Sequence, residues 1–402
     1  MASIIRREVG GKPRYDVKYR EPDGRQRKKT FTRRADADTF AATVEADKIR
    51  GSYIDPDAGK VTFAEYAEEW LSIQTSSPQN RALIARRLRL HVLPVLGRKQ
   101  IGRIRPTTIQ AWMSGLSGSS GTKRQILGHV SAILDAAVAD ERITKNPTKS
   151  KTVARPKQRK VKIKPWTTEQ VGAVRAGLEE HYRIALDLGA GLGLRQGEIM
   201  GLSPGDVDFL RGWVTVRRQV ISFKGRRLYA LPKHGVIRTV PLPSSLRGLL
   251  AAYLAAHPTN EVTLPWGDVD GDSKTFSLVL TNDRTHAAMW PEGLNVRWRR
   301  AVAAAGMLVG TRENQERNGM HALRHHYASV LLDAGENIRA LADYLGHADP
   351  GFTLRVYAHL MPSSAERTRI AVDDAFVRYM AGPSEAREAS EQPLTCTDAA
   401  SA

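Results

Sequence analysis

The sequence predicts a multidomain protein that is mainly α-helical with small β-sheets, and three patterns along the chain support this fold class. Residues 3–50 contain short stretches of alternating apolar and polar residues, followed by a stretch with helical periodicity. Residues 61–146 are helical in pattern throughout, whereas the chain beyond Trp166 mixes helical stretches with short strands. With 402 residues, the chain is long enough for two or three domains with cores of their own.

The N-terminal stretch predicts three strands and a helix, which we assign to a domain over residues 1–52. Tyr15, Val17 and Tyr19 alternate with polar residues in the middle strand, and glycine-containing turns separate the strands. The helix covers one face of the sheet, and the other face is expected to contact DNA, where basic side chains reach phosphates and guanine edges. A solvated basic edge that prevents strand pairing is the alternative. The candidate residues are Lys12, Arg14, Lys18, Arg20, Arg25, Arg27, Lys28 and Lys29.

The middle of the chain, residues 61–146, predicts a compact domain of four helices. Thr62 is placed as an N-cap three residues before Glu65, a spacing typical of a capping box. Lys123 and Arg124 open the fourth helix and are candidates for contacts to phosphates or a DNA groove, with a solvated face equally open. The apolar residues expected on the second helix are Leu83, Ile84, Leu88 and Leu90.

Residues 147–165 form a basic stretch without a single acidic residue, which we interpret as an interdomain linker. Such a block stays extended and follows phosphates through the release of counterions, so its affinity falls steeply with salt. A plain solvated linker is the alternative. The residues expected to contact DNA are Arg155, Lys157, Arg159 and Lys160.

The composition limits the class of binding partner and the cellular compartment that the protein suits. A net charge of +19 and an isoelectric point near 10.1 indicate a polyanionic partner, nucleic acid before a membrane surface. There is no long uncharged apolar run, and the N-terminus lacks the apolar core of a signal peptide. Because Cys396 is the only cysteine, a disulfide or a thiolate metal site within one chain is excluded, and we expect a cytoplasmic setting.

The stretch from Met320 to Leu360 carries the chemistry. His321, Arg324 and His325 stand at helical positions i, i+3 and i+4, so their side chains share one face. His347 follows a glycine at a helix end, and Tyr357 follows ten residues later. Guanidinium and imidazole groups near an isolated tyrosine suit attack by a phenol oxygen on a phosphodiester. The alternative is that the histidines cap helices and the tyrosine is an ordinary half-buried aromatic.

The helix that begins at His321 is expected to be anchored in a core by its apolar residues, which are Ala328, Val330, Leu331 and Leu332. Earlier in the chain, residues 271–277 are expected to form a loop. Residues 365–380 predict a further helix, and residues 383–402 a disordered tail.

The motifs H-x-L-R-H, L-G-H and Y-A-H resemble the second conserved region of the tyrosine recombinases, the phage integrase family. The pattern of this family also includes an Arg and a Glu earlier in the chain, which Arg195 and Glu198 match, and a Lys on a hairpin. Lys233 in L-P-K-H-G matches that Lys better than its rival Lys224. One departure is His326, where the family usually has a small hydroxyl residue.

The resemblance implies a DNA-binding site for one scissile phosphate. Arg195 and Arg324 would each present a planar guanidinium to its non-bridging oxygens, and Glu198 would orient Arg195. His321 and His347 would complete this shell by hydrogen bonding, and His321 could also take the phenol proton.

It also implies the reaction. Tyr357 would form a 3′-phosphotyrosine, and Lys233 would protonate the departing 5′ oxygen. Neither ATP nor a metal is expected. The partners implied are double-stranded DNA, with core and arm sites, and three further copies of the chain in a tetramer. Accessory directionality or DNA-bending proteins are possible partners.

The same resemblance assigns residues 1–52 to an arm-binding domain, 61–146 to a core-binding domain and 166–382 to the catalytic domain, whose C-terminal helix docks on a neighbouring protomer. The N-terminal domain favours an integrase of a phage or integrative element. Three alternatives stay open: a resolvase or invertase, a type IB topoisomerase-like nickase, and a catalytically inactive DNA-binding regulator.

Overall fold

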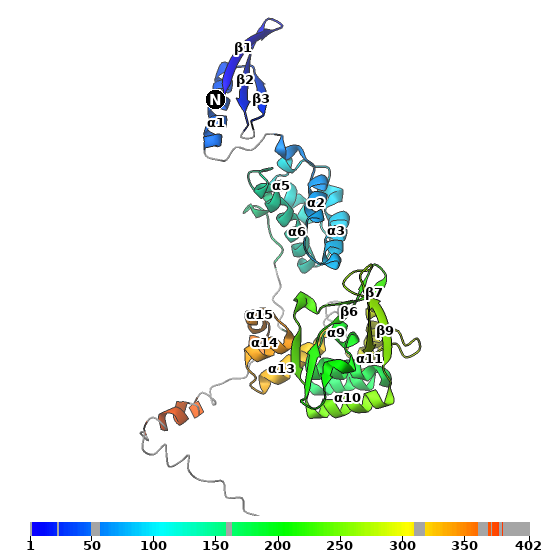
Figure 1. Ribbon diagram of the computed structural model, residues 1–402. Coiled ribbons are helices and arrows are strands. Elements are labelled where there is room, and N and C mark those ends of the chain that lie inside the picture. The colour runs from blue at the N-terminus through cyan, green and yellow to red at the C-terminus, as the bar shows by residue number, and fades with distance from the viewer. Residues whose placement is uncertain are drawn as a thin grey trace, which may run out of the picture. The chain divides into compact units, whose positions relative to one another are not determined.

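The computed structural model describes residues 2–21, 24–49, 57–157, 163–308 and 318–360, together with 369–370, 372–377 and 380. It divides into two compact units, Met1–Lys160 and Val161–Ala402, which are considered separately (Figure 1). No helix in these described ranges is long and apolar enough to cross a membrane. The predicted fold class, mainly helical with small sheets, is confirmed.

The first unit begins with an antiparallel three-stranded sheet in the order β1-β2-β3, made of β1 (Ser3–Val9), β2 (Lys12–Arg20) and β3 (Gln26–Phe31). Helix α1 (Arg34–Ile49) covers one face of it (Figure 1). Val17 and Tyr19 on β2 pack against Ala37 and Val44 on α1, and all four are buried. This small core orients the sheet, because alternate residues of β2 must then point to the opposite face.

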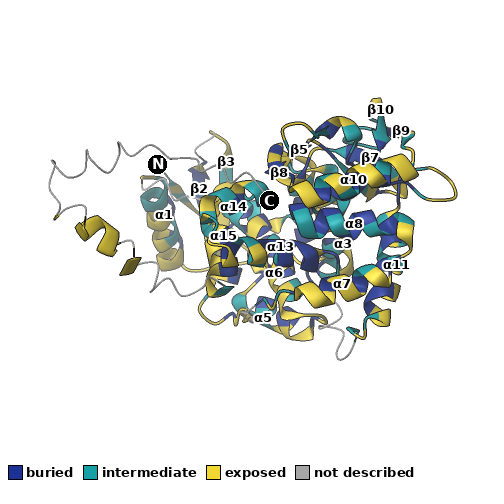
Figure 2. Ribbon diagram, turned by 90° about the horizontal axis from the view of Figure 1, so that it is seen from below, coloured by how far each residue is buried: buried dark blue, intermediate teal, exposed yellow. Residues whose placement is uncertain are grey.

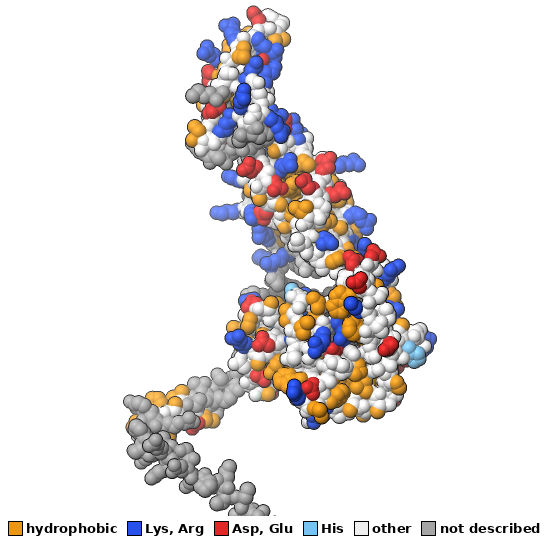
Figure 3. Space-filling model, in the orientation of Figure 1, with side chains coloured by type: hydrophobic (Ala, Val, Ile, Leu, Met, Phe, Trp, Pro, Cys, Tyr) orange, Lys and Arg blue, Asp and Glu red, His pale blue; other side chains and the backbone are white. Residues whose placement is uncertain are grey.

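The strand register corrects the predicted basic face. Arg27 lies opposite Tyr19 and Lys29 opposite Val17, so both stand on the side of the sheet that α1 covers. Arg27 also pairs with Glu21 at 2.9 Å. The open face carries the other predicted strand residues, and it gains Arg7, which lies opposite Arg14 on β1. Lysine and arginine side chains are prominent around this sheet (Figure 3). The basic residues of the open face are Arg7, Lys12, Arg14, Lys18, Arg20 and Lys28.

A buried acid lies within that open face. Asp16 is 5% exposed, accepts a hydrogen bond from Thr30 at 2.6 Å and pairs with Arg7 at 2.9 Å and with Lys28 at 3.7 Å. The Thr30 hydrogen bond and the two cations outweigh burial and hold the pKa of Asp16 below its usual range. Asp16 therefore fixes two of the basic side chains of the open face in place.

The same unit continues with α2 (Phe63–Ser72), α3 (Pro78–His91), α4 (Leu93–Leu96), α5 (Pro106–Gly115) and α6 (Ser120–Ala139). The predicted capping box of Thr62 and Glu65 is present. On α3, Ile84 and Leu88 are buried, but Leu83 and Leu90 are 42% and 47% exposed, contrary to prediction. The latter two are seven residues apart and share a face that points to solvent, so the buried stripe of α3 is narrow.

The helical part extends beyond the predicted boundary at residue 146. The Asn146 side-chain amide donates to Ser131 O at 2.9 Å, Thr148 is fully buried, and Val153 belongs to the helical core. Beyond this point Arg155 and Lys157 line, with Arg124, a hollow of about 530 Å³ on α6. Lys123 is half-buried near the start of the same helix. Arg159 and Lys160 lie outside the described residues.

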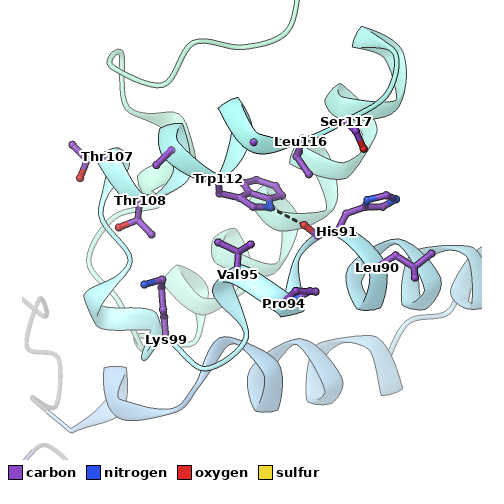
Figure 4. Close-up of a pocket in the computed structure, with 12 residues that line it drawn as sticks. Leu90, His91, Pro94, Val95, Lys99, Thr107, Thr108, Trp112, Leu116 and Ser117 are labelled. Carbon is purple, nitrogen blue, oxygen red and sulfur yellow. Dashed lines mark hydrogen bonds between the residues drawn. The ribbon is translucent and has the colours of Figure 1, made fainter.

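A second hollow of about 710 Å³ opens between the end of α3, α4 and α5 (Figure 4). Leu90, Pro94 and Val95 line one side, and Trp112 donates from Nε1 to His91 O at 2.8 Å. Apolar and hydroxyl side chains dominate its lining. The groups with the predicted chemistry lie in the other unit.

The second unit surrounds three small sheets with helices. Its strands are β4 (Val207–Asp208), β5 (Trp213–Val216) and β8 (Arg238–Pro241) in one sheet, β6 (Gln219–Phe223) with β7 (Arg226–Ala230), and β9 (Asn260–Pro265) with β10 (Ser273–Leu278). The loop predicted at 271–277 is wrong, because most of it is β10. This polar strand is stabilised by its pairing with β9, including a 2.7 Å contact between the hydroxyls of Thr263 and Thr275.

The helices of this unit are α7 (Thr168–Ala176), α8 (Glu180–Leu192), α9 (Gln196–Met200), α10 (Ser244–Ala256), α11 (Pro291–Ala304), α13 (His321–Asp333), α14 (Ile338–Leu345) and α15 (Pro350–Tyr357). Buried residues concentrate on α8 and α13, whereas α10 turns a largely exposed side outward (Figure 2). Gly189 of α8 packs directly on Leu323 of α13. On α13, Ala328 and Leu332 are buried as predicted, but Val330 is 48% exposed.

The predicted C-terminal helix falls partly outside the described residues. Residues 369–370, 372–377 and 380 are helical, and their apolar side chains are exposed. The predicted tail at 383–402 lies outside the described residues altogether.

Candidate active site

The site begins where α8 ends. Gly193 has a left-handed φ of 62°, and a side chain there would meet the ring of Tyr327 at 2.6 Å. Only glycine satisfies both constraints. The chain therefore turns sharply and starts α9 with Arg195 as its N-cap, while the Glu198 carboxylate accepts from the Arg195 backbone N at 2.9 Å.

Glu198 is the centre of a buried ion network. Its side chain is 0% exposed, and it accepts from Arg195 Nη1 at 2.8 Å. Arg238 donates to both carboxylate oxygens, at 2.9 and 2.7 Å, and from Nε to Tyr344 O at 2.7 Å. Burial alone would raise the pKa of Glu198, but the Arg238 hydrogen bonds and charge, together with Arg195, lower it to about 2.

Arg238 is a residue that the sequence prediction missed, although a signal for it exists. It stands two residues before buried Val240 on β8, so it points to the apolar side of the strand. An arginine in that position needs a buried acid, which Glu198 provides.

Arg324 lies at the centre of the site and is 1% exposed. Its Nη1 donates to Gly193 O at 2.7 Å, and its Nη2 contacts Leu345 O and, at 3.1 Å, His347 Nε2. These contacts use three of its five N–H donors, so part of the guanidinium edge stays available for an anion. Burial and the neighbouring charges of Arg195 and Arg238 lower the pKa of Arg324 from its ordinary value. An arginine nevertheless keeps its charge at neutral pH.

His347 is positioned by Gly346, which has a left-handed φ of 62° at the end of α14. Its Nδ1 contacts Thr353 Oγ1 at 2.7 Å. Because Nε2 faces an Arg324 N–H, we assign the proton of the neutral ring to Nδ1, which donates to Thr353. Burial and the Arg324 and Arg195 charges lower the pKa of His347 to about 4, in line with a neutral ring.

Tyr357 ends α15, and its hydroxyl points into the same site. The residue is 1% exposed, and its hydroxyl lies 2.7 Å from His325 Nδ1. Burial outweighs the opposing charges of Arg324 and Arg195 and raises the pKa of Tyr357 to about 12.

The contact with the Tyr357 hydroxyl is made by His325, one helical turn after His321. His321 is exposed on the first turn of α13, with its ring centroid 4.7 Å from that of His325. Burial of part of the ring and the charges of Arg324, Arg195 and Lys233 lower the pKa of His321 to about 4. His325, on the predicted shared face but given no role of its own there, is the histidine next to the nucleophile.

Lys233 lies on an exposed turn between β7 and β8, close enough for its charge to act on His321. Its rival Lys224 lies in the β6–β7 turn, with its ammonium 5.4 Å from the ring of Phe223. The structure thus brings Arg195, Arg324, His321, His347 and Tyr357 into one site with Lys233 at its edge. Within the described ranges, no three His, Cys, Asp or Glu side chains are grouped as metal ligands.

We expect Arg238→Ala to destabilise this unit by about 3–5 kcal/mol, because it leaves the buried Glu198 carboxylate with two of its four hydrogen bonds. Hydrogen exchange of α8 and α13 amides in the full chain measures the loss. Arg355→Ala removes an exposed pair with Asp349, with side chains 68% and 60% exposed, and should change the stability little, because solvent screens such a pair. Equal effects of the two variants would contradict the buried network.

Acidification is expected to destabilise the same unit between pH 6.5 and 5. The pKa of His325 is lowered to about 3 and that of His347 to about 4, so the unfolded chain binds protons in this window that the folded one does not. Stability is therefore full above pH 6.5 and falls as the pH drops, by up to about 2 kcal/mol per histidine at pH 5. Glu198, with a pKa of about 2, titrates below this range. His347→Asn should show a shallower pH dependence of amide exchange; an unchanged slope would argue against a neutral His347.

The sequence profile of the phage integrase family matches residues 167–363, and the profile of the phage integrase central domain matches residues 63–154. The chain belongs to the phage integrase family, the tyrosine recombinases. It is therefore a tyrosine-type site-specific recombinase.

Among individual proteins, the chain is similar to a putative prophage phiRv2 integrase of Mycobacterium tuberculosis, with 26% identity over 86% of this chain and 88% of the relative. Its fold is similar to that of the Tn1549 transposon integrase in complex with circular intermediate DNA, at a TM-score of 0.62 and 19% identity, covering 78% of this chain and 99% of that one. It is also similar to lambda integrase in a tetramer bound to a Holliday junction, at a TM-score of 0.57 and 16% identity, covering 87% and 93%.

Proposed function

We propose that this protein is an integrase that cleaves and rejoins double-stranded DNA through a covalent bond between Tyr357 and a 3′ phosphate. The observation that carries the proposal is the buried hydroxyl of Tyr357, which lies 2.7 Å from His325 Nδ1 on α13, the helix that also carries the buried guanidinium of Arg324. Both Arg195 and Arg324 act electrostatically on Tyr357, so a phosphate bound to them would lie within reach of the phenol oxygen.

The two arginines would bind the non-bridging oxygens of the scissile phosphate. Arg195, with 19% of its side chain exposed, is the accessible one, and Glu198 holds it in place. Arg324 would use the donors that Gly193, Leu345 and His347 leave free. Charge on these oxygens grows in the transition state, and a fixed donor is usually worth about 3–4 kcal/mol there.

The leaving 5′ oxygen needs a proton, and Lys233 is the proposed donor. Its exposed turn at the edge of the site lets the ammonium approach bound DNA. His321, beside it, is placed to hydrogen bond to the phosphate. One phosphoester replaces another in this exchange, so we propose that the reaction requires neither a metal nor ATP.

We propose that DNA binding extends to the first unit. The open face of the N-terminal sheet would contact arm sites, with Arg7 added to the predicted strand residues and Arg27 and Lys29 removed. Arg124, Arg155 and Lys157 line one hollow on α6 and would contact phosphates beside the core site. Assembly as a tetramer on DNA is proposed from the family, with the exposed apolar residues of 369–380 as the docking segment, namely Ile370, Val372, Phe376, Val377 and Met380.

The test is a nicked duplex that carries the attachment site, which can be found by selecting bound duplexes from a random pool. When the strand is cut next to the nick, the short fragment with the new 5′ hydroxyl dissociates. Religation then has no attacking group, so the covalent protein–DNA adduct accumulates and survives SDS. An integrase forms this adduct only on its own site. Relaxation of any supercoiled plasmid would instead indicate a topoisomerase-like nickase, and binding without an adduct would indicate an inactive regulator.

A further inference from the structure

The hydrogen-bond partner of Tyr357 is a histidine that the proposed mechanism leaves without a role. His325 Nδ1 lies 2.7 Å from the phenol oxygen, and the two ring centroids are 5.6 Å apart at an angle of 60°. His325 is half-buried on α13, a helix held in the core through Leu323 and Ala328. This contact is thus made between a rigid helix and the last residue of α15.

We propose that His325, and not His321, receives the phenol proton when Tyr357 attacks the scissile phosphate. This inference rests on the proposed function and names the proton acceptor within it. The geometry separates the two histidines, because His321 lies a full helical turn earlier on α13, exposed and near Lys233 at the edge of the site. His325 occupies the position between that edge and the nucleophile.

The proton stays on Tyr357 while the site is empty. Burial and the charges of His321, Arg324 and His347 lower the pKa of His325 to about 3, whereas burial raises that of Tyr357 to about 12. The charges of His321 and Arg324 on α13, and of His347 between α14 and α15, all disfavour the cation of His325. The phenol is therefore a weak nucleophile in the free protein.

Bound DNA changes this balance. A phosphodiester between Arg195 and Arg324 brings a negative charge that offsets the cations acting on His325 and so favours its protonated form. As the bond from the phenol oxygen to phosphorus forms, that oxygen also becomes far more acidic. The O–H bond of Tyr357 then breaks with its proton moving to His325 Nδ1, while the bond from phosphorus to the 5′ oxygen breaks and Lys233 protonates that oxygen. Religation returns both protons.

Two substitutions of His325 distinguish its two possible roles, which are to hold the phenol by a hydrogen bond and to accept the phenol proton. His325→Asn keeps an acceptor oxygen near the position of Nδ1 but cannot take a proton, and His325→Ala removes both functions. We expect both variants to slow adduct formation on the nicked duplex by about 10²- to 10⁴-fold, the usual range for a positioned proton acceptor. Affinity in gel shifts should stay near that of the unaltered protein.

The decisive arm replaces Tyr357 with a fluorinated tyrosine, whose phenol loses its proton more readily. In His325→Asn, this replacement should raise the rate of adduct formation at least tenfold. In the otherwise unaltered protein, it should change that rate little or lower it. The control is His359→Gln, two residues from Tyr357, which keeps a donor for Ile163 O, the partner of His359 Nε2 at 2.8 Å. That variant should form the adduct at the normal rate.

A normal rate for His325→Asn would overturn the proposal, since it would leave His325 with a holding role only. A slow His325→Asn that the fluorinated tyrosine does not rescue would overturn it as well. Neither result would affect the proposed function, which fails only if the unaltered protein forms no adduct with its site.

Discussion

Tyr357→Phe is expected to abolish the covalent adduct with DNA while leaving DNA affinity within about twofold of normal. The change removes one oxygen from a residue that is 1% exposed and keeps the ring that fills this space. It leaves His325 Nδ1 without its partner, a loss of about 1 kcal/mol that a folded protein tolerates. SDS-resistant adducts on the nicked duplex and gel shifts on the intact one measure the two properties.

Tyr344→Phe is the matched control, because this half-buried tyrosine on α14 contributes its backbone carbonyl to Arg238. That contact survives the substitution, so the adduct should form normally. An adduct that persists in Tyr357→Phe would show that another residue is the nucleophile. Loss of DNA affinity together with the adduct would show a folding defect and would leave the substitution uninformative until a stable variant was compared by thermal unfolding.

Lys233→Ala is expected to slow cleavage by about 10²- to 10⁴-fold, because the 5′ alkoxide then leaves without a proton donor. A duplex with sulfur in place of the bridging 5′ oxygen tests this role directly, since a thiolate leaves without being protonated. On that substrate, Lys233→Ala should cleave at nearly the rate of the unaltered protein. Single-turnover adduct formation on the two duplexes is the measurement.

Lys224→Ala provides the comparison, as the same charge is removed from the neighbouring β6–β7 turn. It should leave both rates near normal. If the sulfur substrate rescued Lys224→Ala and not Lys233→Ala, Lys224 would be the proton donor in place of Lys233. If it rescued neither and only Lys233→Ala were slow, the lysine would act through phosphate binding and not as an acid.

Much of the fold followed from short-range patterns. The alternation of Tyr15, Val17 and Tyr19 predicted β2, and the spacing of Thr62 and Glu65 predicted the start of α2. The polar strand β10 escaped prediction, because its pairing with β9 lies beyond any local period. Arg27 was placed on the wrong face, since the register between two strands, and not the charge of a residue, decides which side it occupies.

By itself, the sequence determined the kinds of side chain in the candidate site and their helical spacing, because a helix sets which residues share a face. Helical spacing alone predicted that the side chains of His321, Arg324 and His325 lie on one face. Tertiary structure alone decided which partner each one has. Arg238 reaches Glu198 across 40 residues, and His325 reaches Tyr357 across 32, through the packing of separate elements. Burial in that packing then sets the pKa values, which depend on what surrounds a group in space and not on its neighbours in the chain.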